Sequence, residues 1–104
     1  MAWGYLLVAG LFEIGWALGL KYSEGFTRLW PSVWTLVTMA LSLWCLAVAV
    51  RTIPLGTGYA VWTGIGAAGT AVLGMILFQE SDHPLRLASI GVIIMGIVGL
   101  KLTS

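Results

Sequence analysis

The sequence predicts an all-α integral membrane protein with four transmembrane helices. Three observations lead to this class: 60% of the 104 residues are hydrophobic, 9% are charged, and the mean hydropathy is +1.01. Because soluble globular domains carry about 25% charged residues, an ordinary soluble fold is excluded. The length accommodates four spans of about 20 residues with short links. We therefore expect one membrane domain over residues 1–104, with spans at about 3–20, 31–50, 55–78 and 85–102.

The first span carries a carboxylate, Glu13, near its middle. An ionisable residue at the centre of a transmembrane helix costs about 2.5–3.5 kcal/mol on insertion scales and usually indicates function. The alternative is a structural carboxylate bonded to a neighbouring helix, but no Lys, Arg or His lies at comparable depth to pair with it. A cleavable signal is rejected, because no basic residue precedes Lys21 and Glu13 interrupts the apolar core.

The second span is predicted to begin at Pro31, which suits the first turn of a helix. Ser42 is its mid-depth polar residue, and its hydroxyl can bond either to another helix or back to its own backbone. Cys45, the single cysteine, lies in an apolar run and is interpreted as a small buried hydrophobe. The link at 51–54 is so short that spans two and three should be antiparallel neighbours.

The third span is rich in glycine, which allows helices to approach closely in lipid. Its pair Gly64 and Gly66 also marks a place where a helix can kink. Tyr59 and Trp62 lie three residues apart on one face, an arrangement that fits either packing at the membrane interface or the wall of a binding site.

The third link contains Glu80, Asp82 and His83, residue types that can bind a metal. They occupy nearly consecutive loop positions and have no second cluster to complete a coordination shell, so a solvated turn is the preferred interpretation. We predict no metal and no cofactor. In the fourth span, Ser89 and Gly96 lie on one face and form a candidate dimer seam.

The basic residues are almost evenly divided between the two sides of the membrane. Four spans place Lys21, Arg28 and Arg86 on one side and Arg51 and Lys101 on the other. An excess of Lys and Arg sets orientation, so this small bias predicts insertion in both directions and an antiparallel homodimer. Such a dimer supplies the two inverted repeats from which many transporters are built, and exchange of shape between its protomers would give alternating access.

The surroundings of Glu13 predict a polar cation site. Small residues on its helical face leave room beside the carboxylate, and competition between protons and a cation for that carboxylate is sufficient for antiport. A net charge of +1 gives no electrostatic footprint for nucleic acid. Four other side chains could offer an indole N–H or a hydroxyl to the Glu13 site: Trp16, Ser42, Tyr59 and Trp62.

Over essentially its whole length the chain resembles the small multidrug resistance family of four-helix, proton-coupled exporters, within it the guanidinium exporter branch. The matching segments are GLFEIGWA at 10–17, LKYSEGFTRL with PS at 20–29 and 31–32, and GTGYAVWTGIG at 56–66. The resemblance implies that Glu13 binds proton and substrate alternately. It also implies an antiparallel dimer and these roles: Tyr59 and Trp62 wall the site, Ser42 and Trp16 orient the glutamates, and the third helix kinks at Gly64 and Gly66.

The expected function is therefore proton-coupled export of guanidinium and small substituted guanidinium ions across the cytoplasmic membrane, and not an enzymatic reaction. Trp16 indicates the branch, since exporters of polyaromatic cations usually have a small residue there. Guanidinium suits a carboxylate beside aromatic rings, because it is planar, weakly hydrated and offers paired N–H groups. The alternatives are a broader exporter of quaternary ammonium cations, a small dual-topology ion channel, and a structural subunit of a larger membrane complex.

Overall fold

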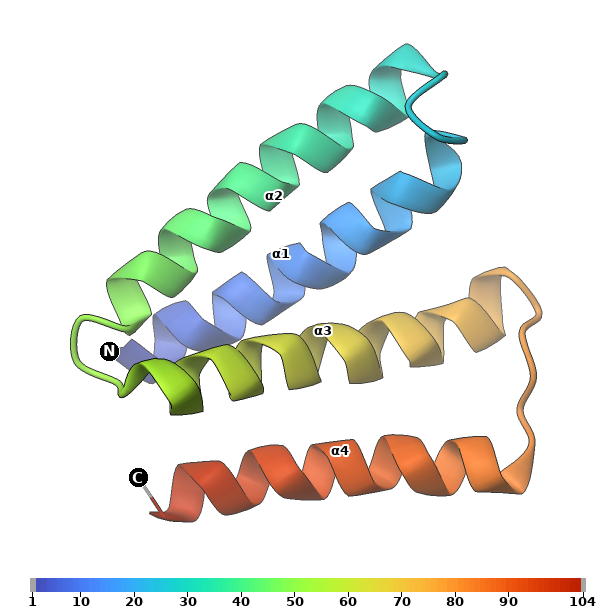
Figure 1. The fold of residues 1–104 in the computed structure, drawn as a ribbon. Coiled ribbons are helices and arrows are strands. Elements are labelled where there is room, and N and C mark those ends of the chain that lie inside the picture. The colour runs from blue at the N-terminus through green and yellow to red at the C-terminus, as the bar shows by residue number, and fades with distance from the viewer. Residues whose placement is uncertain (1, 104) are drawn as a thin grey trace.

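The protein, described over residues 2–103 by a computed structural model, folds into four long helices in that range (Figure 1). Each helix is long and apolar enough to cross a membrane, which confirms the all-α, four-span expectation. The helices alternate in direction, so the α1–α2 and α3–α4 links lie at one end of the molecule. Their bounds are α1 Ala2–Tyr22, α2 Leu29–Ala49, α3 Leu55–Leu77 and α4 Pro84–Thr103.

The helix ends follow from local sequence. α2 begins at Leu29, two residues before the expected start, so Pro31 lies within the first turn, where backbone N–H groups have no intrahelical acceptor. At the end of α1 the Ser23 hydroxyl donates to the Leu20 carbonyl at 2.9 Å. The chain then turns through Gly25, whose φ of 73° is accessible to glycine without strain.

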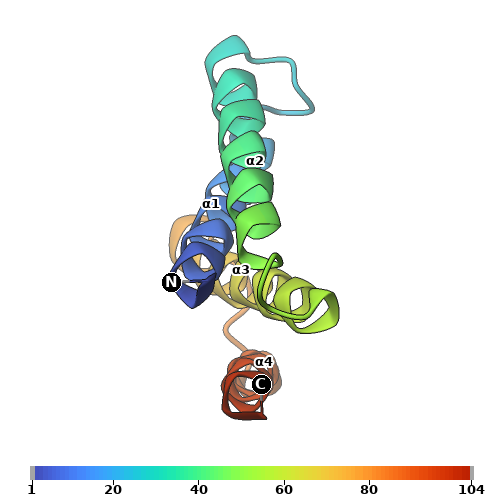
Figure 2. The ribbon, with the colours of Figure 1, turned by 90° about the vertical axis from the view of Figure 1, so that its left-hand side faces the viewer.

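The first three helices pack together, whereas α4 stands apart. α1 packs against both α2 and α3, while the backbone of α4 approaches that of α3 alone. Figures 1 and 2 both show α4 at the edge of the molecule, remote from α2. Within its described residues α4 buries one side chain, Ile90. At its far end the Lys101 ammonium lies 4.7 Å from the centre of the Trp3 ring. Most of the α4 surface is therefore open to lipid or to another helix.

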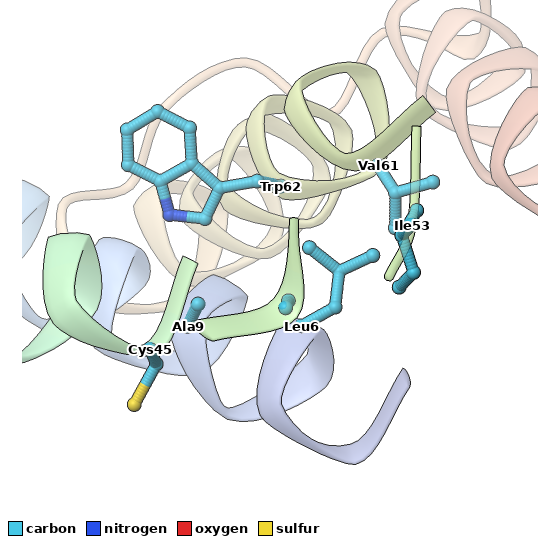
Figure 3. Close-up of a cluster of buried hydrophobic side chains, with 7 residues drawn as sticks. Leu6, Ala9, Cys45, Ile53, Val61 and Trp62 are labelled. Atoms are coloured by element: carbon cyan, nitrogen blue, oxygen red, sulfur yellow. The ribbon is translucent and has the colours of Figure 1, made fainter. Parts of the chain in front are cut away.

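A small core joins α1, α2 and α3 near the α2–α3 link. Cys45 is 5% exposed and lies in this core, as its apolar surroundings in the sequence predicted. Many large hydrophobic side chains lie outside it, an arrangement that suits contact with lipid rather than water. The buried members of the core, most of which are labelled in Figure 3, are Leu6, Ala9, Cys45, Ala49, Ile53, Val61 and Trp62.

Candidate functional site

Glu13 lies in the middle of α1, half-buried, and its carboxylate rests directly against α3. It fits because position 66 of α3 is glycine: a Cβ there would collide with the Glu13 carboxylate and would lie 2.9 Å from its Cγ. The Oε2 atom of Glu13 is buried and has no hydrogen-bond partner among residues 2–103. A buried acceptor without a partner costs about 1–3 kcal/mol, so this oxygen is free to bind a ligand.

Trp16 lies beside Glu13, just under one turn further along α1. Its indole Nε1 is also buried and lacks a hydrogen-bond partner within the described chain. Both side chains line an open cavity of about 510 Å³ between α1 and α3. An unpaired acceptor and an unpaired donor thus border the same space. The cavity is lined by Glu13, Trp16, Ala17, Thr63, Gly66, Ala67, Thr70, Ala71 and Glu80.

Ser42 and Trp62 form a second polar cluster, in which the side-chain groups are paired. The fully buried Ser42 hydroxyl donates to the Ala9 carbonyl at 2.7 Å and accepts the Trp62 Nε1–H at 2.9 Å. One hydroxyl therefore links α1, α2 and α3. The sequence left open whether Ser42 bonds to its own helix, and the structure shows it bonding to the two neighbouring helices instead.

Tyr59 packs against this second cluster from the surface, with its ring tilted relative to that of Trp62. Its ring centre lies 5.6 Å from that of Trp62, at an interplanar angle of 52°, and the residue is 56% exposed. Within the single chain, Tyr59, Trp62 and Ser42 are not among the residues that line the Glu13 cavity. The structure thus brings Glu13 and Trp16 together in one group and Ser42, Trp62 and Tyr59 in another.

The two glycines proposed as a hinge face different neighbours. α3 is one helix from Leu55 to Leu77 and passes through both positions without a break. A Cβ at Gly64 would lie 3.0 Å from the Ile97 side chain of α4, whereas Gly66 faces Glu13 of α1. The hinge itself stays a prediction.

Glu80 is a cavity residue that the sequence placed in a solvated turn. It lines the same cavity as Glu13, and its Oε1 pairs with Arg86 Nη2 at 3.0 Å. Nearby, the His83 Nδ1 accepts the Leu85 N–H at 3.1 Å, and residues 2–103 contain no group of three potential metal ligands. Of the cluster at 79–84, Glu80 is the member that reaches the cavity.

A stripe on α3 faces Glu13 and could have been found in the sequence. Cavity-lining residues recur at the spacing of one helical face and are all small or carry a hydroxyl. A single bulky residue in this stripe would fill the space beside the carboxylate. Its members are Thr63, Gly66, Ala67, Thr70 and Ala71.

Comparison with known proteins gives a consistent result. A family model described as Small Multidrug Resistance protein matches residues 1–93. A guanidinium exporter of Yersinia pseudotuberculosis serotype I (strain IP32953) is 59% identical over 104 residues, covering all of both chains. Guanidinium exporters of Citrobacter freundii and Escherichia coli O6:H1 are 56% and 55% identical, covering all of this chain and 99% of theirs.

Proposed function

Since the chain belongs to the Small Multidrug Resistance family, we propose that it exports guanidinium and small substituted guanidinium ions in exchange for protons. It is a multi-pass protein of the inner cell membrane. The family and branch that the sequence resembled are thereby confirmed. The observation that carries the proposal is the buried, unpaired Oε2 of Glu13 beside a cavity between two membrane helices.

The Glu13 cavity has the chemistry that a guanidinium ion requires. A carboxylate can accept two parallel N–H bonds from the planar cation, and an aromatic ring can stack on its face. Trp16 supplies such a ring beside Glu13, and its unpaired N–H can donate to a carboxylate oxygen that the cation leaves free. The small stripe on α3 leaves the space in which the ion would lie.

Exchange for protons follows from the properties of one carboxylate. Glu13 in an apolar environment is most stable when neutralised, either by a proton or by a bound cation. A cation can bind there only when the proton has left, and a proton can return only when the cation has gone. If the protein changes its open side only when Glu13 is neutralised, inward proton flow drives outward cation flow.

We propose that the working unit is an antiparallel homodimer. Two features support it: the basic residues are divided three against two, and most of α4 is unpacked in one protomer. A Cβ added at Gly91, Gly96 or Gly99 would meet nothing within 4 Å, which leaves room for a second helix to pack against α4. In this dimer the exposed Tyr59 would face the partner, and Gly64 and Gly66 would act as the hinge for alternating access.

Uptake of guanidinium into proteoliposomes under an imposed pH gradient tests the function. Wild type should accumulate guanidinium against its gradient, and Glu13→Gln, which cannot exchange a proton, should lose this accumulation. Glu24→Gln is the matched control, because Glu24 is exposed in the α1–α2 link. If wild type moves a quaternary ammonium but not guanidinium, the proposed substrate is wrong. If Glu13→Gln transports normally, the coupling role of this residue is wrong.

Labelling from each side of the membrane tests the topology. A cysteine at the exposed Thr27, in a Cys45→Ser background, should react with a membrane-impermeant maleimide in about half of the chains from each side. Labelling from one side alone would exclude an antiparallel homodimer.

A further inference from the structure

Glu80 stands between solvent and the Glu13 cavity. Its side chain is 46% exposed, yet it lines the cavity to which Glu13 and Trp16 also contribute. It lies beyond the end of α3, on the linker that connects to α4. A cation that entered the cavity from this end of the molecule would therefore pass Glu80 before it reached Glu13.

The chain holds Glu80 over α3 in the way that it holds Glu13. A Cβ at Gly74 would collide with the Glu80 carboxylate, just as a Cβ at Gly66 would collide with Glu13. The linker folds back over the helix end, where the Glu80 N–H donates to the Gly74 carbonyl at 3.3 Å. The two glycines are eight residues apart, about 12 Å along the helix. α3 thus presents two glycines, each covered by a carboxylate, and both carboxylates line the same cavity.

A guanidinium group of the chain itself already occupies the Glu80 carboxylate. Arg86 Nη2 donates to Glu80 Oε1 at 3.0 Å and to the Ala71 carbonyl at 3.4 Å, while its buried Nε has no partner among the described residues. Within those residues the ion pair has one N–H···O contact, although this pair of groups can form two. The Arg86 side chain is 33% exposed. Partly exposed ion pairs of this kind contribute little and exchange readily.

We propose that Glu80 is an outer binding site for the transported cation, and that Arg86 occupies this site until a substrate guanidinium displaces it. The proposal rests on the guanidinium export proposed above. Displacement replaces one guanidinium by another on the same carboxylate, so the bonds lost and gained are similar and the exchange is reversible. Arg86 remains attached to the chain and can return, which releases the cation towards Glu13. The outer carboxylate raises the concentration of cations at the cavity mouth.

The competing interpretation is a structural ion pair that holds the linker in place. In that case Glu80→Gln and Arg86→Gln both loosen the same linker, and both should impair transport in the same direction. The outer site predicts opposite effects on the KM for guanidinium. Removing the Glu80 charge removes the site and should raise KM, whereas removing Arg86 removes the competitor for the site and should lower KM.

The experiment measures guanidinium uptake into proteoliposomes for wild type, Glu80→Gln, Arg86→Gln and the double variant. Glu80→Gln should raise KM by up to about five-fold, the change that an exposed ion pair typically contributes, with little change in kcat. Glu24→Gln is the control, because it removes a carboxylate at the same end of the molecule but outside the cavity. Arg86→Gln leaves two basic residues on each side, so it does not tip the insertion bias.

Glu80→Gln could raise KM in two ways: it removes the carboxylate that binds the cation, and it releases Arg86, whose positive charge would repel the cation. The double variant distinguishes these two effects, because it lacks Arg86. If Glu80 binds the cation, Glu80→Gln raises KM in the Arg86→Gln background as well. Three outcomes overturn the proposal: a shift of KM in the same direction in both single variants, a Glu80→Gln variant that behaves like Glu24→Gln, or no effect of Glu80→Gln once Arg86 is replaced. If wild type does not transport guanidinium, the proposed function fails and the outer site with it.

Discussion

Two polar clusters lie one helical turn apart along α1, and they differ in whether their groups are paired. In the closed cluster, the Ser42 hydroxyl joins the Ala9 carbonyl to the Trp62 indole across three helices. In the open cluster, the Glu13 Oε2 and the Trp16 Nε1 are both buried and have no partner within residues 2–103. Each cluster contains a tryptophan, Trp62 in one and Trp16 in the other, so the presence of an indole N–H does not show whether that group is paired.

The difference suggests two kinds of role. A closed hydrogen-bond cluster stabilises the packing of the helices that contribute to it. Removing one of its groups leaves the partner groups buried in an apolar environment without a hydrogen bond. An open cluster contains a hydrogen-bond acceptor and a donor without partners, and a ligand can bind to them. Mutations in the closed cluster should therefore affect stability first, and mutations in the open cluster should affect transport first.

The largest effect is expected for Gly66→Ala. The new Cβ would collide with the Glu13 carboxylate and push it out of its position. A displacement of about 1 Å at a reacting group can reduce the rate about 100-fold, and we expect a loss of that order in guanidinium uptake. Gly56→Ala, on the same helix where a Cβ meets nothing within 4 Å, should transport normally.

A shorter acidic side chain provides the rescue. Glu13→Asp should withdraw the carboxylate from position 66, so the double variant with Gly66→Ala should lose much less activity than the product of the two single losses. Additive losses in uptake would show that Gly66 affects transport in another way, such as through the flexibility of α3.

The next effect in size is expected for Trp16→Phe. The substitution keeps an aromatic ring but removes an N–H that has no partner among residues 2–103, so the free energy of unfolding should change little. A hydrogen bond to a charged group contributes about 1.5–3 kcal/mol, so KM for guanidinium should rise about ten-fold or more. Uptake and unfolding measured on one preparation would check both parts. A large loss of stability without a change in KM would contradict the open-cluster interpretation.

Ser42→Ala should show the opposite pattern. It leaves the buried Trp62 N–H without an acceptor, and we expect about 1 kcal/mol of destabilisation in a reversible unfolding measurement. Adding Trp62→Phe removes the stranded donor, so the double variant should be less destabilised than the sum of the two single variants. Ser32→Ala is a suitable control, because Ser32 lies on the same helix as Ser42 and its hydroxyl donates to the Arg28 carbonyl four residues earlier in the chain.

The sequence predicted four long apolar helices, because a membrane span requires about 20 mostly apolar residues and the sequence contains four such runs. The sequence also identified Glu13, because a single carboxylate within a membrane span is costly and therefore indicates a function. It could not separate the open cluster from the closed one. The pairing of Ser42 with Ala9 and Trp62 depends on how three helices face one another, and those contacts join residues up to 33 positions apart.

Glu80 was not predicted as part of the cavity for a related reason. The polar residues around it favoured a solvated turn, and most of them are indeed exposed. The position of Glu80 over α3 depends on a linker that folds back onto Gly74 and on an ion pair with Arg86, six residues further on. The types of residue in a linker do not predict the course that its backbone takes.

The smallest effect is expected at a third tryptophan, Trp34, which tests the comparison from outside the cavity. Its Nε1 donates to the Gly15 carbonyl at 2.9 Å, between Glu13 and Trp16 in the sequence, and the residue is 56% exposed. Because this bond is formed and does not face the cavity, Trp34→Phe should cost about 0.6 kcal/mol of stability and leave KM unchanged. If Trp34→Phe raises KM as much as Trp16→Phe does, proximity to Glu13 rather than an unpaired donor determines the effect. Whether a cluster is open or closed would then not predict which substitutions affect transport.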